Sequence, residues 1–214
     1  GISESEVGQY NDNGITQEQA AALLKEYLES FEKSVNSFID AHNLKLNQQQ
    51  FDALVSFTYN LGPSWMQSSG IFRTAVINGT KGNEFIYAMA QFGKAGGSPV
   101  GGLIERRLCE ANLYLNGTYS TQPPANYKYV IYNGNMDGVV PTVTIQGYNS
   151  TLSAAIKSTV TPKAGYRFMG WYTQAEGGDW ITVLGSKSVG TNKLYAHWQN
   201  GEGPRNADGS IKGT

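Results

Sequence analysis

Cysteine, charge and long apolar runs are all scarce in this chain, and each shortage excludes a class of protein. The single cysteine, Cys109, rules out a disulfide within the chain. No apolar run approaches the roughly 20 residues that a membrane-spanning helix needs. Residues 1–4 also lack the basic and apolar segments of a signal peptide. We therefore expect neither a disulfide scaffold nor a membrane span.

The charged residues make up only 15% of the chain, and their distribution argues against nucleic acid as a partner. Residues 1–118 hold 8 Lys or Arg and 12 Asp or Glu, while residues 119–214 hold 8 and 5. The two parts are thus mildly acidic and mildly basic, without the basic runs that bind a phosphate backbone. The 40% hydrophobic content is sufficient to build a folded core.

The composition changes near residue 119. Apolar residues recur at helical spacing before this point, whereas alternating, aromatic and glycine-rich segments follow it. Residues 116–124 read Asn-Gly-Thr-Tyr-Ser-Thr-Gln-Pro-Pro, which is typical of turns and linkers. We predict an α+β multidomain protein. Its expected parts are a helical domain (1–118), a linker (119–126), a β-rich module (127–199) and a flexible tail (200–214).

Capping signals and apolar periodicity predict the helices. Thr16 and Gln19 form a capping box at the start of a helix that extends through residue 39. Ser69 is the expected cap of a later helix. The other predicted helices cover residues 47–61, 70–77, 83–92 and 103–114. In the second half, short β-branched and aromatic segments predict strands at 127–132, 140–145, 166–172 and 193–198, with a short helix at 153–158.

Three motifs of the helical part carry a family resemblance. Residues 50–62 read Gln-Phe-Asp-Ala-Leu-Val-Ser-Phe-Thr-Tyr-Asn-Leu-Gly, and residues 101–110 read Gly-Gly-Leu-Ile-Glu-Arg-Arg-Leu-Cys-Glu. Residues 15–20 read Ile-Thr-Gln-Glu-Gln-Ala. In this order and at these separations, they resemble the phage-type lysozymes of glycoside hydrolase family 24 over residues 10–117.

The resemblance implies a peptidoglycan hydrolase that cleaves the β-1,4 bond between N-acetylmuramic acid and N-acetylglucosamine. The helical part would form one wall of the glycan cleft, with loop 93–98 as a flexible rim. The residues expected to contact substrate are Ser56, Tyr59, Asn60, Gln91, Phe92, Arg106 and Arg107. Structural alternatives stay open: Tyr59 in the core, Asn60 as a helix cap, and Arg107 paired with Glu110 at i,i+3.

The catalytic acid is the main departure from the family pattern. The family places its general-acid Glu near the end of a helix, and a second polar group on a hairpin after it; both would precede Gly1, so we assign no catalytic residue. Glu4, Glu6 and Asp12 fit solvated loop and turn positions better. Two hypotheses remain open. One is a hydrolase completed by an upstream segment, a separate peptide or a second chain; the other is an inactive lysozyme-like protein that binds glycan or builds a phage particle.

A second resemblance covers the β-rich part. Residues 129–134 read Tyr-Val-Ile-Tyr-Asn-Gly, residues 166–172 read Tyr-Arg-Phe-Met-Gly-Trp-Tyr, and residues 194–198 read Leu-Tyr-Ala-His-Trp. They resemble one Listeria–Bacteroides (internalin B-type) repeat, a β-grasp-like module of bacterial surface and wall proteins. Because a module of this size needs large side chains in its core, we expect Trp171, Tyr195 and Trp198 inside and Trp180 exposed.

No cofactor or metal is expected. The two histidines, His42 and His197, fall in different predicted domains, and no glycine-rich phosphate loop is present. Cys109 fits a small packed side chain better than a nucleophile. The two resemblances together predict a wall-associated, secreted or phage-encoded protein whose partner is peptidoglycan.

Overall fold

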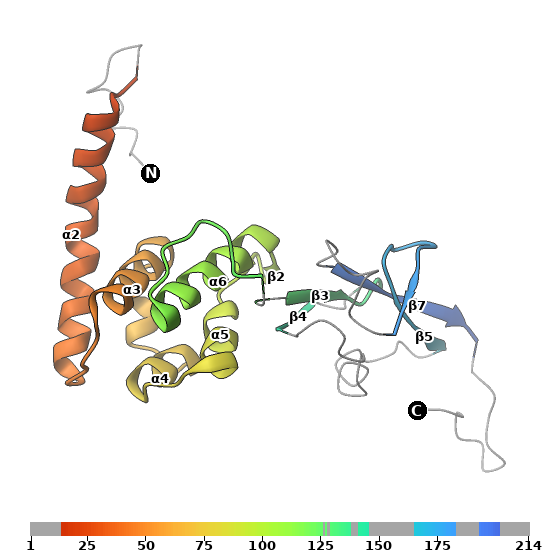
Figure 1. Cartoon of the computed structure of the whole chain (residues 1–214). Helices are drawn as coiled ribbons and strands as arrows, with labels where there is room; N and C mark the ends of the chain where they lie inside the picture. The colour runs from red at the N-terminus through yellow and green to blue at the C-terminus, as the bar shows by residue number, and fades with distance from the viewer. Residues whose placement is uncertain are drawn as a thin grey trace.

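The computed structural model describes residues 14–125, 127, 129–137, 141–145, 165–182 and 193–201. A helical region is followed by a small mixed β-sheet, so the fold is α+β as predicted (Figure 1). The helical elements are α2 (Gln17–Ala41), α3 (Gln48–Leu61), η1 (Pro63–Met66), α4 (Ile71–Ile77), α5 (Gly82–Ala90) and α6 (Gly101–Asn116). Glu4, Glu6, Asp12 and the helix expected at 153–158 lie outside the described residues.

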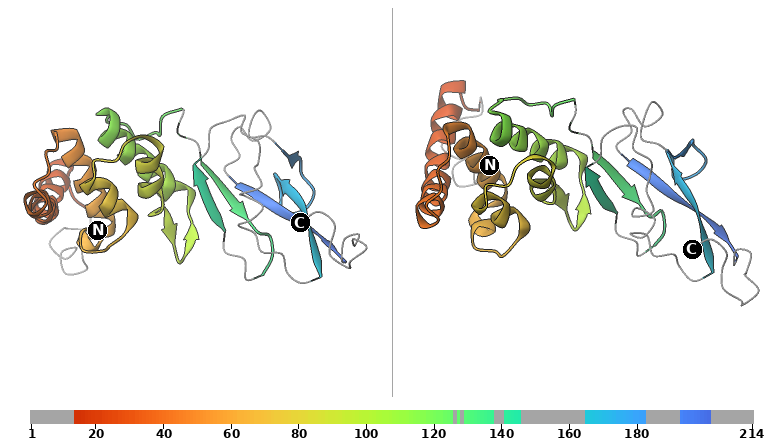
Figure 2. Two further views of the ribbon diagram at one scale, coloured as in Figure 1. Left: turned by 90° about the horizontal axis from the view of Figure 1, so that it is seen from below. Right: turned by 60° about the horizontal axis from the view of Figure 1, so that its bottom comes forward.

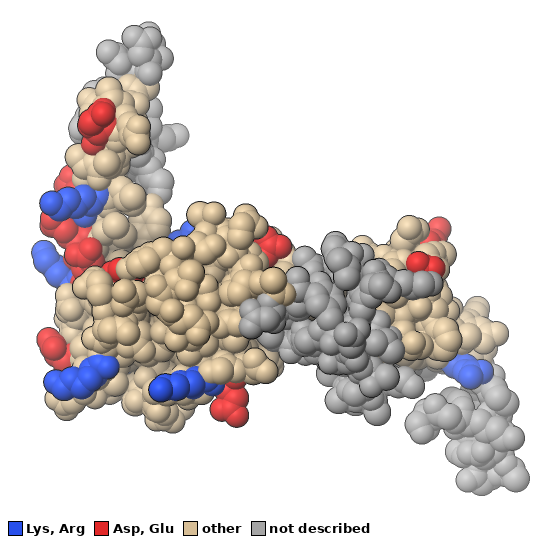
Figure 3. All heavy atoms as spheres, viewed as in Figure 1, with Lys and Arg blue, Asp and Glu red and all other residues tan. Residues whose placement is uncertain are grey.

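Helix α2 is held to the molecule by its C-terminal half. The predicted capping box is confirmed, since Thr16 Oγ1 accepts from the Gln19 backbone and Gln19 Oε1 accepts from the Thr16 backbone. The fully buried side chains of α2 are Val35 and Phe38. The N-terminal half stands clear of the other helices (Figure 1), and charged side chains gather along the helix (Figure 3). Packing of one end therefore fixes a helix that is otherwise solvated.

Helices α3 and α6 form the centre of the helical region. A second capping box, Asn47 with Gln50, starts α3, and Gly62 ends it with a positive φ of 77°. Helix α6 ends at Gly117, whose left-handed conformation favours glycine. The two helices run antiparallel, because Asn60 of α3 contacts Arg107 of α6 and the earlier residue Ser56 contacts the later residue Glu110.

Aromatic side chains fill the core beside these helices. Phe57 of α3 makes ring contacts with Trp65, Phe72 and Phe92 at centroid distances of 5.7, 4.3 and 5.1 Å. Two polar side chains in this core are hydrogen-bonded: Trp65 Nε1 donates to Thr58 Oγ1, which itself donates to a backbone carbonyl of α3. A rigid aromatic core therefore supports the inner face of α3.

One local prediction was wrong. Ser69 does not cap a helix: α4 starts after Gly70, and no side chain caps it. The loop expected at 93–98 contains a short hairpin of strands β1 (Lys94–Ala95) and β2 (Ser98–Pro99). Gly96 and Gly97 at its tip both have positive φ, which is typical of a tight two-residue hairpin turn.

The sheet contains β3 (Tyr129–Asn133), β4 (Thr142–Ile145), β5 (Tyr166–Tyr172), β6 (Trp180–Ile181) and β7 (Lys193–Asn200). Its strand order is β4-β3-β7-β5-β6, with β3 and β7 parallel and the other pairs antiparallel. The four predicted strands are present: β5 has the predicted bounds and the other three have shifted ends, whereas β6 was not predicted. An irregularity between Phe168 and Gly170 keeps Phe168 on the same face as Trp171, so both contact the same core.

One face of the sheet has a core of its own, and β3 also contacts the helical region. The sheet core consists of Val130, Tyr132, Trp171, Ile181, Leu194 and Ala196. Trp171 is buried and Trp180 is 61% exposed, as predicted, while Tyr195 and Trp198 are half-buried. Tyr129 and Ile131 join the helical core instead.

Strands β3 and β4 are the nearest to the helices (Figure 2). The Tyr129 hydroxyl donates to Glu105 Oε1 of α6 at 3.1 Å. The two regions thus share a contact, and the domain boundaries expected from composition stay a prediction. Within the described residues, no helix is long and apolar enough to cross a membrane.

Candidate functional site

A carboxylate of α6, Glu110, gathers most of the predicted site residues. Ser56 Oγ donates to Glu110 Oε1 at 2.7 Å, and Arg106 Nε lies 3.0 Å from the same oxygen. Arg107 Nε lies 2.9 Å from Glu110 Oε2. Arg107 Nη2 also donates to Asn60 Oδ1 at 2.9 Å. We call these five residues the Glu110 network. They join the C-terminal half of α3 to the middle of α6.

Arg107 and Glu110 form the buried part of the network. The Arg107 side chain is 0% exposed, and its guanidinium lies over the Phe57 ring at 4.9 Å. Burial lowers the pKa of Arg107 to about 10, although Glu110 opposes the shift. Burial also raises the pKa of Glu110, against the opposite effects of Arg107 and Ser56. Burial thus disfavours both charges, and only their mutual contact and hydrogen bonds keep them in place.

A shallow groove of about 380 Å³ opens beside the network. Ser56, Arg106 and Glu110 line it from the two helices, and residues 119–121 form its other wall. The Tyr119 hydroxyl donates to the Asp52 carboxylate of α3, which holds this segment in place. That hydrogen bond is the main reason why the pKa of Tyr119 is raised. The sequence predicted residues 119–121 as part of a linker, because no local pattern indicates that this segment packs on α3.

The other predicted site residues lie outside the network. Tyr59 is exposed on α3 and packs edge-to-face on Phe31 of α2, with ring centroids 5.6 Å apart. Gln91 donates to the Tyr87 carbonyl of its own helix. Phe92 contacts Phe57 in the aromatic core. The fold therefore brings Ser56, Asn60, Arg106 and Arg107 together. Tyr59 is the residue before Asn60 on α3.

Comparison with known proteins identifies the family. The phage lysozyme family matches residues 1–110, which is half of the chain. The chain belongs to the phage lysozyme family. The resemblance found in the three sequence motifs is thereby confirmed, and every member of the Glu110 network falls within the matched residues.

Individual relatives each match about half of the chain. The endolysin of Bacillus phage B103 is 33% identical over 105 residues, which are 48% of this chain and 37% of that endolysin. The endolysin of Salmonella phage P22 is 32% identical over 102 residues, 48% of this chain and 66% of that protein. The chain therefore spans less than two-fifths of the Bacillus phage endolysin.

A solved structure is similar to the same part of the chain. It is the muramidase domain of SpmX from Asticaccaulis excentricus, with 33% sequence identity and a TM-score of 0.42. The similarity covers 48% of this chain and 69% of that domain.

Two other kinds of reactive site, a nucleophilic thiol and a metal centre, are not found among the described residues. Cys109 lines the groove but is half-buried, and burial raises the pKa of its thiol, with Glu110 and Glu105 adding to the effect. Such a thiol is a poor nucleophile. Among the described residues, no three His, Cys, Asp or Glu side chains are grouped as metal ligands. The Glu110 network and the groove beside it are therefore the candidate functional site.

We expect the buried arginine to control stability and its neighbour to contribute little. Arg107→Met leaves Glu110 buried without its closest cation, so the free energy of unfolding should fall by about 3 kcal/mol. Arg106→Met is the matched control, because the Arg106 side chain is 39% exposed; its loss should be about 1 kcal/mol or less. Urea unfolding followed by circular dichroism measures both. If Arg107→Met and Arg106→Met lower the free energy of unfolding equally, burial does not decide how much each arginine contributes to stability.

Proposed function

We propose that this chain is part of a peptidoglycan hydrolase that cleaves the β-1,4 bond between N-acetylmuramic acid and N-acetylglucosamine. The observation that supports the proposal most is the family match, which includes the whole Glu110 network. The helical region would form one wall of the glycan cleft. The side chains that we assign to substrate binding are Ser56, Tyr59, Asn60, Gln91, Phe92 and Arg106, and Arg107 is assigned to positioning them.

The network suggests what these side chains do. Asn60 is exposed, and because Arg107 holds its Oδ1, its amide nitrogen is left to donate, for example to an N-acetyl carbonyl. Arg106 is held by Glu110 and the Ser56 backbone at the edge of the groove, where it faces acidic groups of the substrate. The exposed Tyr59 ring beside Asn60 offers a face to a pyranose. Arg107 is buried and positions Asn60.

Hydrolysis also needs a protonated carboxyl group beside the leaving oxygen and a second polar group across the bond. Glu110 is buried and held by two arginines and Ser56, so it fits an anchoring role and not that of the acid. We propose that the acid comes from a segment that precedes Gly1, where the family resemblance places it.

Release of reducing ends from purified peptidoglycan tests this proposal. We expect release when the 214 residues are fused to the N-terminal segment of the Bacillus phage B103 endolysin that precedes its aligned region. Asn60→Ala in the fusion should lower kcat/KM about 10-fold, since one hydrogen bond to substrate is lost. The control is Asn83→Ala, an exposed amide of α5 outside the network. Saturable binding of peptidoglycan without reducing ends would favour an inactive glycan-binding protein.

We further propose that the β-sheet is a β-grasp-like Listeria–Bacteroides repeat that attaches the protein to the cell wall or to a phage particle. The supporting feature is Trp180, whose ring packs against the backbone at Gly170. A Cβ atom at Gly170 would lie 2.5 Å from Trp180 Nε1, so glycine is what lets the indole lie over β5. The indole is 61% exposed, and such a ring can stack on a sugar.

Sedimentation with insoluble peptidoglycan tests the attachment role in the full chain. Trp180→Ala should weaken binding about 3- to 10-fold, the range that loss of one aromatic contact gives. Met169→Ala is the matched control, because Met169 is 41% exposed on the neighbouring strand β5. If both variants bind like the unmodified chain, Trp180 has no part in attachment.

A further inference from the structure

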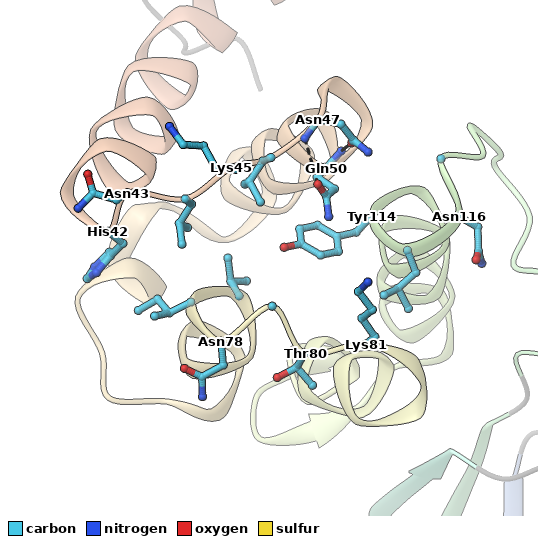
Figure 4. A pocket seen from close by; sticks show the side chains of 17 residues that line it. His42, Asn43, Lys45, Asn47, Gln50, Asn78, Thr80, Lys81, Tyr114 and Asn116 are labelled. Carbon is cyan, nitrogen blue, oxygen red and sulfur yellow. Dashed lines mark hydrogen bonds between the residues drawn. The ribbon is translucent and has the colours of Figure 1, made fainter.

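A cavity in the helical region lies at the end opposite the Glu110 network. It has a volume of about 800 Å³ and is lined by residues 42–47 with Gln50, by residues 76–81 and by residues 114–117 (Figure 4). Gln50 lies near the start of α3 and Tyr114 near the end of α6. Tyr114 follows Arg107 by seven residues, or about 10 Å along the helix axis. The cavity is therefore separate from the groove.

Tyr114 presents an unpartnered hydroxyl to this cavity. Its side chain is only 5% exposed, and its ring stacks on Phe85 with centroids 4.3 Å apart and planes 17° apart. The stack fixes the ring so that the hydroxyl points into the cavity (Figure 4). No hydrogen bond to this hydroxyl is found among the described residues, and burial raises its pKa. The ring is buried while the hydroxyl opens into the cavity, where it can donate to a bound acceptor.

Two further donors point to the same space. Gln50 Oε1 accepts from the Asn47 backbone at 3.0 Å, which leaves the Gln50 amide nitrogen to donate into the cavity. Lys81 extends toward Tyr114 from the opposite side (Figure 4). The lining also includes His42 and Lys45 but no Asp or Glu, so the cavity favours an anion.

We propose that this cavity binds the C-terminal carboxylate of a short peptide. A hydroxyl, an amide nitrogen and an ammonium supply hydrogen bonds and charge for a carboxylate. Leu44, Leu46 and Val76 form apolar walls that suit a small aliphatic side chain next to it. If the proposed function holds, the source is the alanine-ending peptide stem of peptidoglycan. The helical region would then hold the glycan at one end and a stem peptide at the other.

Titration of the full chain with D-alanyl-D-alanine, followed by NMR, tests the proposal. The dipeptide should bind at least about 10-fold more tightly than its C-terminal amide, because the amide lacks the charge. Acetate, which has the carboxylate but not the peptide, should also bind more weakly. Equal affinity for acid and amide would overturn the carboxylate site, and equal affinity for dipeptide and acetate would overturn the peptide assignment.

Variants locate the binding. Tyr114→Phe keeps the stack on Phe85 but removes the hydroxyl, and Lys81→Gln removes the charge; each should weaken dipeptide binding about 10-fold. Lys45→Gln is the matched control, since Lys45 points away from the cavity centre in Figure 4 and its loss should change affinity little. Unchanged binding by both Tyr114→Phe and Lys81→Gln would overturn the proposal.

The test stays separate from that of the hydrolase. The titration measures binding without hydrolysis, and Arg106→Met, which alters the groove, should leave dipeptide binding unchanged. If the chain binds the dipeptide at Tyr114 but the fusion releases no reducing ends, the cavity site stands and the proposed function does not. If Arg106→Met abolished dipeptide binding, the groove and the cavity would not be independent sites, and the proposal would be overturned.

Discussion

The buried contact between Arg107 and Glu110 is the interaction on which the helical region depends. Burial opposes the charge of each side chain, so neither is stable there without the other. Ser56 and Asn60 complete the hydrogen bonding from α3, and the Phe57 ring lies under the guanidinium. The same contacts that join α3 to α6 thereby orient the polar side chains that border the groove.

Helix α6 links all the surfaces to which we assign a function. Its first turns carry Arg106 and the network, its last turn carries Tyr114 at the cavity, and Glu105 accepts the hydrogen bond from Tyr129 of the sheet. Because α3 runs antiparallel to α6, the groove and the cavity lie at opposite ends of one rigid helix pair. A ligand with both a glycan and a peptide has the chemistry that such a pair of sites accepts.

Local features of the fold could be predicted from the sequence, and features that depend on distant contacts could not. The capping box at Thr16 and the pairing of Arg107 with Glu110 follow from spacings of three residues, which a helix brings together. By contrast, Tyr119 meets Asp52 across 67 positions, so the groove wall was assigned to a linker. The Tyr114 cavity was not predicted either, because a buried aromatic at helical spacing indicates core, and only the packed structure shows that its hydroxyl has been left open.

A double-mutant cycle between Arg107 and Glu110 tests the central claim most directly. The free energies of unfolding of the unmodified chain, Arg107→Met, Glu110→Gln and the double variant are measured by urea titration. If the two side chains stabilise α3 and α6 as a pair, the double variant should lose less stability than the two single losses combined, by at least about 1 kcal/mol. Additive losses, within about 0.5 kcal/mol, would contradict the account, since they would mean that the pair does not act as a unit.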